Sequence, residues 1–188
     1  KLPADSGATD QRNEPSFPIV GIVASAGGLD SFKSFFRAVR ENCGMAFVLV
    51  PHLDSKRKSS LVELLSRESC LPVVEATDGM RIKADSVYVI PHNHTLMLSQ
   101  GVMRLGALPD PIGARTAIDM FLRSLAEDQQ SKAIGIVFSG TGSHGTLGIR
   151  EIKRCGGMAM VQTPESSEFD QMPRSAIETG LVDFILPP

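Results

Sequence analysis

Short apolar runs alternate with amphipathic segments along most of the chain. The run Ile19-Val20-Gly21-Ile22-Val23 has no polar position, which is the pattern of a strand covered on both faces. Residues 29–40 instead place apolar side chains three and four positions apart, which predicts a helix. The same reasoning predicts strands at residues 19–23, 46–50, 72–76, 86–90, 134–138, 158–161 and 182–186, and helices at residues 29–40, 59–67, 116–128, 146–154 and 175–178.

Strands that alternate with helices predict an α/β fold with a doubly wound, mainly parallel sheet and flanking helices. The middle of the chain departs from this alternation. Residues 95–99 and 102–105 flank Gln100-Gly101, which predicts a small antiparallel hairpin inserted into the fold. Residues 106–114 are rich in Gly and Pro and are expected to form a loop.

The first 16 residues differ from the rest because they are polar and have no periodicity. They are expected to be a disordered linker, and residues 17–188 a single domain with a sizeable core. The chain begins without Met or a signal-like apolar segment, which favours a piece of a longer protein with neighbouring domains.

Composition excludes several classes of partner. A net charge of -2 supplies no basic field, so no binding to nucleic acid is expected. No apolar run approaches the ~20 residues that span a bilayer, so no membrane insertion is expected. Cys43, Cys70 and Cys155 are odd in number and far apart, which favours reduced thiols and a cytoplasmic protein.

Chemistry-bearing residues follow three of the predicted strands. Ser25 follows the first, His52 follows the second, and a glycine-rich segment at residues 139–145 follows the strand at 134–138. Ligands of open α/β sheets bind outside the carboxyl ends of the strands. A serine, a histidine and a donor-rich loop are therefore expected to converge at one edge, as in a serine hydrolase.

Ser25 lies among small residues in Ala24-Ser25-Ala26-Gly27-Gly28, where a hydroxyl could stand exposed above the sheet. The turn matches G-x-S-x-G only in part, because Val23 replaces the first glycine. The alternative role for Ser25 is the N-cap of the following helix. His52 could act as general base toward Ser25, and the alternative is a surface histidine at the start of a loop.

The segment from Gly140 to Gly145 reads G-x-G-x-x-G, and Glu165 lies twenty residues beyond it. That spacing also fits a dinucleotide-binding loop with its ribose-binding acid. The same loop could instead form an oxyanion hole, because both functions need backbone N–H groups that face an anion.

A metal site is a further reading of the histidines, because His92 and His94 are spaced as half of one and His52 and His144 could complete it. No carboxylate or cysteine stands at a metal-binding spacing beside them. No metal is therefore expected.

With these residues placed, the chain resembles the catalytic domain of the chemotaxis receptor glutamate methylesterases, the CheB type, over residues 17–187. It resembles in particular the methylesterase domains fused with a receptor methyltransferase. The resemblance depends on the order and spacing of short blocks: Ala24-Ser25-Ala26-Gly27-Gly28, Pro51-His52, Glu75-Ala76-Thr77-Asp78-Gly79, Val89-Ile90-Pro91, Arg115-Thr116-Ala117-Ile118-Asp119, Ser139-Gly140-Thr141-Gly142-Ser143 and Met172-Pro173-Arg174-Ser175-Ala176-Ile177.

The resemblance implies that Ser25 is the nucleophile and His52 the general base, with Thr141 and Gly142 as backbone oxyanion donors. The implied substrate is a glutamate γ-methyl ester on the cytoplasmic domain of a chemoreceptor, and the products are glutamate and methanol. Some family members also deamidate receptor glutamines. No cofactor is implied, and the expected neighbouring domains are a methyltransferase or regulatory domains.

One residue departs from the family's pattern, because His144 stands where the triad carboxylate is expected. A carboxylate there would hold the base histidine in its tautomer and stabilise the imidazolium that forms. Loss of that charge in serine proteases lowers kcat about 10⁴-fold, which corresponds to about 5.5 kcal/mol. The alternatives are an esterase with an altered triad, a weakened or inactive receptor-binding or regulatory module of the same fold, and an engineered substitution. Asp119 is a further carboxylate, but the sequence does not place it near His52.

Overall fold

The computed structural model describes residues 15–51, 61–108 and 113–188, and it leaves the side chains of residues 113–116 undescribed. The described residues form one seven-stranded sheet in the order β3-β4-β2-β1-β7-β8-β9, in which every neighbouring pair is parallel. This confirms the predicted doubly wound α/β fold. The strands are β1 (Ile19–Ala24), β2 (Ala46–Pro51), β3 (Val73–Glu75), β4 (Ser86–Val89), β7 (Ala133–Val137), β8 (Met158–Gln162) and β9 (Phe184–Leu186).

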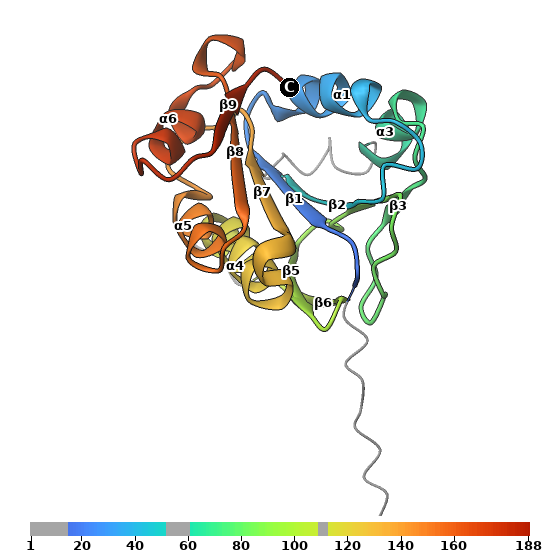
Figure 1. Cartoon of the computed structure of the whole chain (residues 1–188). Helices are drawn as coiled ribbons and strands as arrows, with labels where there is room; N and C mark the ends of the chain where they lie inside the picture. The colour runs from blue at the N-terminus through green and yellow to red at the C-terminus, as the bar shows by residue number, and fades with distance from the viewer. Residues whose placement is uncertain (1–14, 52–60, 109–112) are drawn as a thin grey trace, which may run out of the picture.

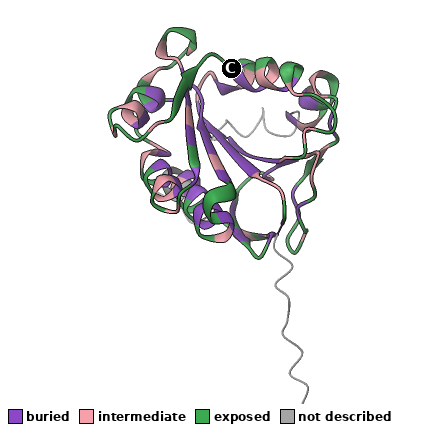
Figure 2. Ribbon diagram, viewed as in Figure 1, coloured by how far each residue is buried: buried purple, intermediate pink, exposed green. Residues whose placement is uncertain are grey.

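Burial explains why the central strands read as unbroken apolar runs. All six residues of β1 and all six of β2 are buried, whereas the edge strand β9 is exposed throughout, as Figure 2 shows. The chain builds the sheet outward from β1 in one direction and then returns to add β7 on the other side of β1. The carboxyl ends of β1 and β7 therefore form the topological switch point, where open α/β sheets bind their ligands.

Helices cover both faces of the sheet (Figure 1). The helices α1 (Gly28–Ala38) and α3 (Leu61–Glu68) lie on one face, and α4 (Gly113–Gln129) and α5 (Thr146–Arg154) lie on the other. A short helix, α6 (Gln171–Ile177), lies beside β8. The described residues also form two 3-10 turns, η1 (Gln130–Lys132) and η2 (Pro164–Ser166).

Aromatic side chains join α1 to the sheet. Phe36 of α1 meets Phe47 of β2 edge to face at 5.5 Å, and Phe32 meets Phe138 at 5.7 Å. Such pairs contribute beyond the area they bury. This packing fixes the helix that directly follows Ser25.

The predicted hairpin is confirmed as an antiparallel pair, β5 (His94–Ser99) and β6 (Val102–Ala107). Its turn residues Gln100 and Gly101 both have positive φ, which suits a tight hairpin turn. The hairpin packs on α4, where the hydroxyl of Ser124 accepts the N–H of Leu98 and Asp128 accepts the N–H groups of both turn residues.

Several element boundaries differ from the sequence-based expectation. The helix α6 begins at Gln171, four residues before the predicted start, with Pro173 inside its first turn. Proline is tolerated there because the first N–H groups of a helix have no partner within the helix. The helix α4 begins at Gly113 and β6 extends to Ala107, so both take in ends of the predicted loop at residues 106–114.

The predicted linker falls mostly outside the described residues, which begin at Pro15. Pro15 is buried, and its carbonyl accepts a hydrogen bond from Lys132 Nζ at 3.1 Å. Among the helices of the described ranges, none is long and apolar enough to cross a membrane.

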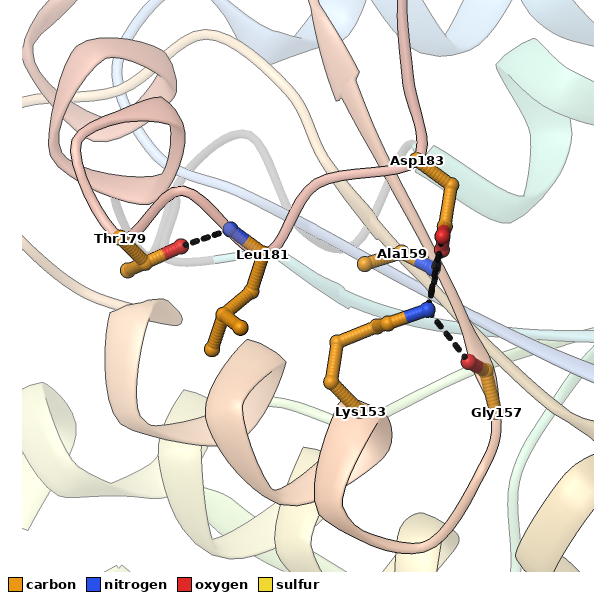
Figure 3. A network of polar contacts seen from close by, with 6 residues as sticks. All are labelled: Lys153, Gly157, Ala159, Thr179, Leu181 and Asp183. Carbon is orange, nitrogen blue, oxygen red and sulfur yellow. Dashed lines mark hydrogen bonds and ion pairs between the residues drawn. The ribbon is translucent and has the colours of Figure 1, made fainter.

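A polar network fixes the segment that leads into the edge strand β9 (Figure 3). Asp183 accepts the N–H of Ala159 at 2.8 Å and pairs with Lys153 Nζ at 2.7 Å, and Lys153 also donates to the carbonyl of Gly157. Burial would raise the pKa of Asp183, but the hydrogen bond from Ala159 and the charge of Lys153 outweigh it and hold the pKa below its ordinary value.

We expect Asp183→Asn to lower the free energy of unfolding by about 1 kcal/mol at neutral pH, because the amide keeps an acceptor but loses the charge. Asp183→Ala should cost about 2 kcal/mol, because Ala159 then loses its partner. Denaturant unfolding measures both. Asp30→Asn is the matched control, since the Asp30 side chain is 87% exposed, and it should change stability little.

The effect has a defined pH dependence. The pKa of Asp183 is lowered on folding, so the ionised carboxylate stabilises the fold above its unfolded pKa of about 3.9. The difference between the natural protein and Asp183→Asn should therefore be constant above about pH 5 and shrink as the pH falls through the folded pKa. A difference that grew on acidification would contradict the assigned role of Asp183.

Candidate active site

Ser25 lies in a tight turn between β1 and α1. The residue is almost fully buried, at 4% exposure, and its carbonyl accepts the N–H of Gly28 at 3.1 Å. The N-cap of α1 is Gly27, with φ of 74°, so the alternative of Ser25 as an N-cap is wrong. The small residues of the turn are required, because a Cβ on Gly27 would lie 2.7 Å from both Ser139 Oγ and Glu168 Cβ.

Ser139, which follows β7, holds this turn in place. Its carbonyl accepts the N–H of Ser25 at 3.0 Å, and its hydroxyl donates to the carbonyl of Ala26 at 2.9 Å. The same hydroxyl accepts the N–H of Phe169 at 3.0 Å. Ser139 is fully buried, so the Ser25 turn, the end of β7 and the segment before α6 are joined at one residue.

Gln162, the last residue of β8, supports Ser139 from the neighbouring strand. Its side-chain carbonyl accepts the N–H of Ser139 and the hydroxyl of Ser31, each at 2.9 Å. Its amide nitrogen donates to the carbonyl of Ser166, also at 2.9 Å. Gln162 is 1% exposed, and these bonds satisfy a polar group that would be costly to bury unpaired.

Gly140 brings the loop after β7 against Ser25. A Cβ at this position would lie 2.9 Å from Ser25 Cβ and 2.1 Å from Met172 Sδ, so only glycine fits. Its N–H donates to the carbonyl of Phe169 at 2.9 Å, and its own carbonyl accepts the N–H of Met172 at 3.0 Å. The residues that follow Gly140 are thereby held beside Ser25.

The two predicted oxyanion donors differ in their surroundings. Thr141 is exposed, and within the described part of the chain no hydrogen bond engages its N–H. The N–H of Gly142 donates to the side-chain oxygen of Gln171 at 2.8 Å. Thr141 thus presents a free donor at the rim of the site, and the Gly142 donor already has an acceptor.

His144 lies at the far end of the same loop. Its half-buried ring folds back on Gly142, and its Nε2 would stand 3.3 Å from a Cβ on that glycine. His144 directly precedes Gly145, the left-handed N-cap of α5. The predicted partner His52 lies outside the described residues, so the structure gives no distance between the two rings.

Asp119 belongs to α4, and its side chain reaches the first turn of α5. There its Oδ1 accepts the N–H of Gly148 at 2.8 Å. A dinucleotide-binding loop would place a pyrophosphate at such a helix start. A carboxylate already in that place disfavours a second anion, and Gly140 is packed against Ser25 and Met172. These contacts favour a hydrolytic loop over a dinucleotide-binding one.

The two other histidines, His92 and His94, lie between the end of β4 and the start of the hairpin. His94 begins β5, and its Nδ1 contacts the carbonyl of His92 at 2.7 Å. In residues 15–51, 61–108 and 113–188, no group of three His, Cys, Asp or Glu side chains could hold a metal ion.

Two hollows open on the surface near β8. A polar hollow of about 430 Å³ adjoins the Ser25 turn, with Gly27, Ser31 and Glu168 in its wall. An apolar hollow of about 360 Å³ lies between α1 and the sheet, with Phe35 and Phe138 in its wall and no residue of the Ser25 turn.

Sequence reasoning placed Ser25 and the loop at residues 139–145 at one edge, and the structure brings them together. It did not single out Ser139, Gln162 or Gln171. Ser139 and Gln162 share one available signal: each is a polar residue at the end of an apolar strand. Nothing in the sequence joins Gln171 to Gly142, which lies 29 positions away.

Comparison with known proteins agrees with this geometry. A family model described as CheB methylesterase matches residues 20–188. A putative protein-glutamate methylesterase/protein-glutamine glutaminase of Leptospira interrogans is 30% identical over 91% of this chain and 89% of its own length. A protein-glutamate methylesterase/protein-glutamine glutaminase of Pyrococcus abyssi is 33% identical over 93% of this chain, which spans 49% of that longer protein.

A solved structure is also similar. The crystal structure of the Thermotoga maritima CheB methylesterase catalytic domain superposes with a TM-score of 0.84 at 32% identity, and the match covers 92% of this chain and 93% of that domain. The family match extends over nearly the whole folded part of the chain. It includes the Ser25 turn and the loop that follows β7. The chain belongs to the CheB methylesterase family.

Proposed function

We propose that this domain hydrolyses glutamate γ-methyl esters on a chemoreceptor, with Ser25 as nucleophile and His52 as general base. The observation that supports this most is the placement of Ser25. It follows β1 at the switch point, in contact with Gly140, and is tied to Ser139 by its backbone N–H. The substrate class comes from the similar proteins, which are named as protein-glutamate methylesterases.

The proposed reaction has two halves. The hydroxyl of Ser25 attacks the ester carbonyl while His52 takes its proton, and the N–H of Thr141 stabilises the oxyanion. Methanol leaves with the proton from His52, and water then hydrolyses the acyl-enzyme to release the glutamate. A glutamine side chain would follow the same steps and release ammonia. None of these steps requires a cofactor.

His144 is the observation that favours a second candidate, a weakened or inactive regulatory module. A neutral imidazole at this position could accept a hydrogen bond from His52 but could not supply negative charge. A protonated His144 would repel the imidazolium that develops on His52. We therefore propose a methylesterase whose kcat is limited at residue 144.

The proposed partner is the cytoplasmic domain of a chemoreceptor, and the proposed location is the cytoplasm. Neighbouring methyltransferase or regulatory domains are part of the same proposal, since the chain spans about half of the Pyrococcus abyssi relative.

We expect Ser25→Ala to abolish methanol release from methylated receptor, because no other group supplies the attacking oxygen. Covalent labelling of Ser25 by a fluorophosphonate should be lost in the same variant. Ser131→Ala, an exposed change in η1, is the matched control and should retain both signals. Unchanged turnover in folded Ser25→Ala protein would exclude Ser25 as the nucleophile.

We expect His144→Asp to raise kcat by 10²-fold or more, because a carboxylate stabilises charge that develops on His52 in the transition state. KM should change little, since the gain arises after the substrate binds. Steady-state methanol release measures both, and His94→Asp controls for an added charge elsewhere. Equal kcat in His144→Asp and the natural protein would show that residue 144 does not limit turnover.

A further inference from the structure

The side chain of Gln171 reaches the loop that carries the proposed oxyanion donors. Its Oε1 accepts the N–H of Gly142 at 2.8 Å, across 29 positions of sequence. An N···O distance of 2.8 Å is that of a well-formed hydrogen bond. The Gly142 donor is therefore engaged in the protein without substrate.

Backbone contacts hold Gln171 opposite this loop. Its neighbour Met172 is fully buried and donates its N–H to the carbonyl of Gly140, and Phe169 accepts the N–H of Gly140. These bonds fix the start of α6 against the loop. The side chain of Gln171 itself is exposed, so it can leave Gly142 without disturbing the core.

The group that Gly142 binds has the chemistry of a substrate. A glutamine side-chain carbonyl has the same sp² oxygen as a glutamate methyl ester, and it is the group that a glutaminase attacks. Oxyanion donors accelerate acyl transfer only when they are directed at the reacting carbonyl oxygen. A donor engaged by a residue of the protein has to be released before it can serve.

We propose that Gln171 is an internal competitor of the substrate carbonyl for the Gly142 N–H, and so determines access to the oxyanion site. This proposal rests on the proposed function of Ser25. Each substrate carbonyl displaces the Gln171 side chain from the N–H of Gly142. The displaced side chain then turns toward solvent. Thr141 stays available throughout, so the competitor lowers the rate without closing the site.

The size of the effect follows from the strength of one neutral hydrogen bond. Its net contribution corresponds to roughly two- to tenfold in an equilibrium constant. A carboxylate at residue 171 would hold the donor more strongly, because hydrogen bonds to charged acceptors are about twice as strong.

Two variants of equal length test the proposal. Gln171→Met removes the acceptor and keeps the volume, and Gln171→Glu strengthens the acceptor. Each is made in the natural protein and together with His144→Asp, which supplies a more active reference. Gln100→Met, at the exposed hairpin turn, is the matched control.

Two measurements are needed, and only one of them depends on activity. The first is the second-order rate at which a fluorophosphonate labels Ser25, with kcat/KM for methanol release beside it. Gln171→Met should raise both roughly two- to tenfold, Gln171→Glu should lower both, and Gln100→Met should leave both unchanged. The second is the ¹H–¹⁵N signal of Gly142, whose proton should shift upfield in Gln171→Met as the bond is lost.

The outcomes separate this inference from the proposed function. If Ser25 is labelled but Gln171→Met is no faster than the natural protein, the competitor role is wrong and the esterase proposal stands. An unchanged Gly142 signal in Gln171→Met would also overturn it. If Ser25 is labelled in no variant, including those with His144→Asp, the proposed function fails and this inference fails with it.

Discussion

The hydrogen bond from the Ser25 N–H to the carbonyl of Ser139 joins the ends of β1 and β7 beyond their last paired residues, Val23 and Val137. The turn after β1 needs a fixed partner, because Ser25 is buried and its N–H cannot reach water. Ser139 accepts that N–H with its carbonyl, and its hydroxyl donates to the carbonyl of Ala26. The position of Ser25 is therefore set by the sheet rather than by a surface loop.

This constraint extends outward through buried polar groups. Gln162 accepts the N–H of Ser139, and the Ser139 hydroxyl accepts the N–H of Phe169. Gly140 then donates its N–H to the carbonyl of Phe169 and accepts the N–H of Met172. Every buried side-chain nitrogen or oxygen of the described residues has a hydrogen-bond partner. A fully satisfied polar network of this kind rigidifies a site, which suits chemistry that depends on an aligned nucleophile.

The sequence was sufficient to predict the sheet and the edge at which chemistry gathers. Strands such as β1 and β2 are apolar at every position because both faces are covered, and the rule that ligands bind at the carboxyl ends of strands then brought Ser25 and the β7 loop together. The start of α6 could not be read in this way, because Pro173 resembles a helix breaker until its place in the first turn is known. The partners of Ser139, Gln162 and Gln171 could not be predicted either, because a polar residue reveals its role only when the fold has brought its distant partner beside it.

Among the residues that the structure describes, the hydrogen bonds that join the Ser25 turn to Ser139, Gln162 and Phe169 are made without His144. His144 lies beyond Gly142 in the same loop. The scaffold that holds Ser25 and the residue proposed to support the general base are therefore separate. Under the proposed mechanism, a substitution at residue 144 alters catalytic power and leaves the architecture around Ser139 in place.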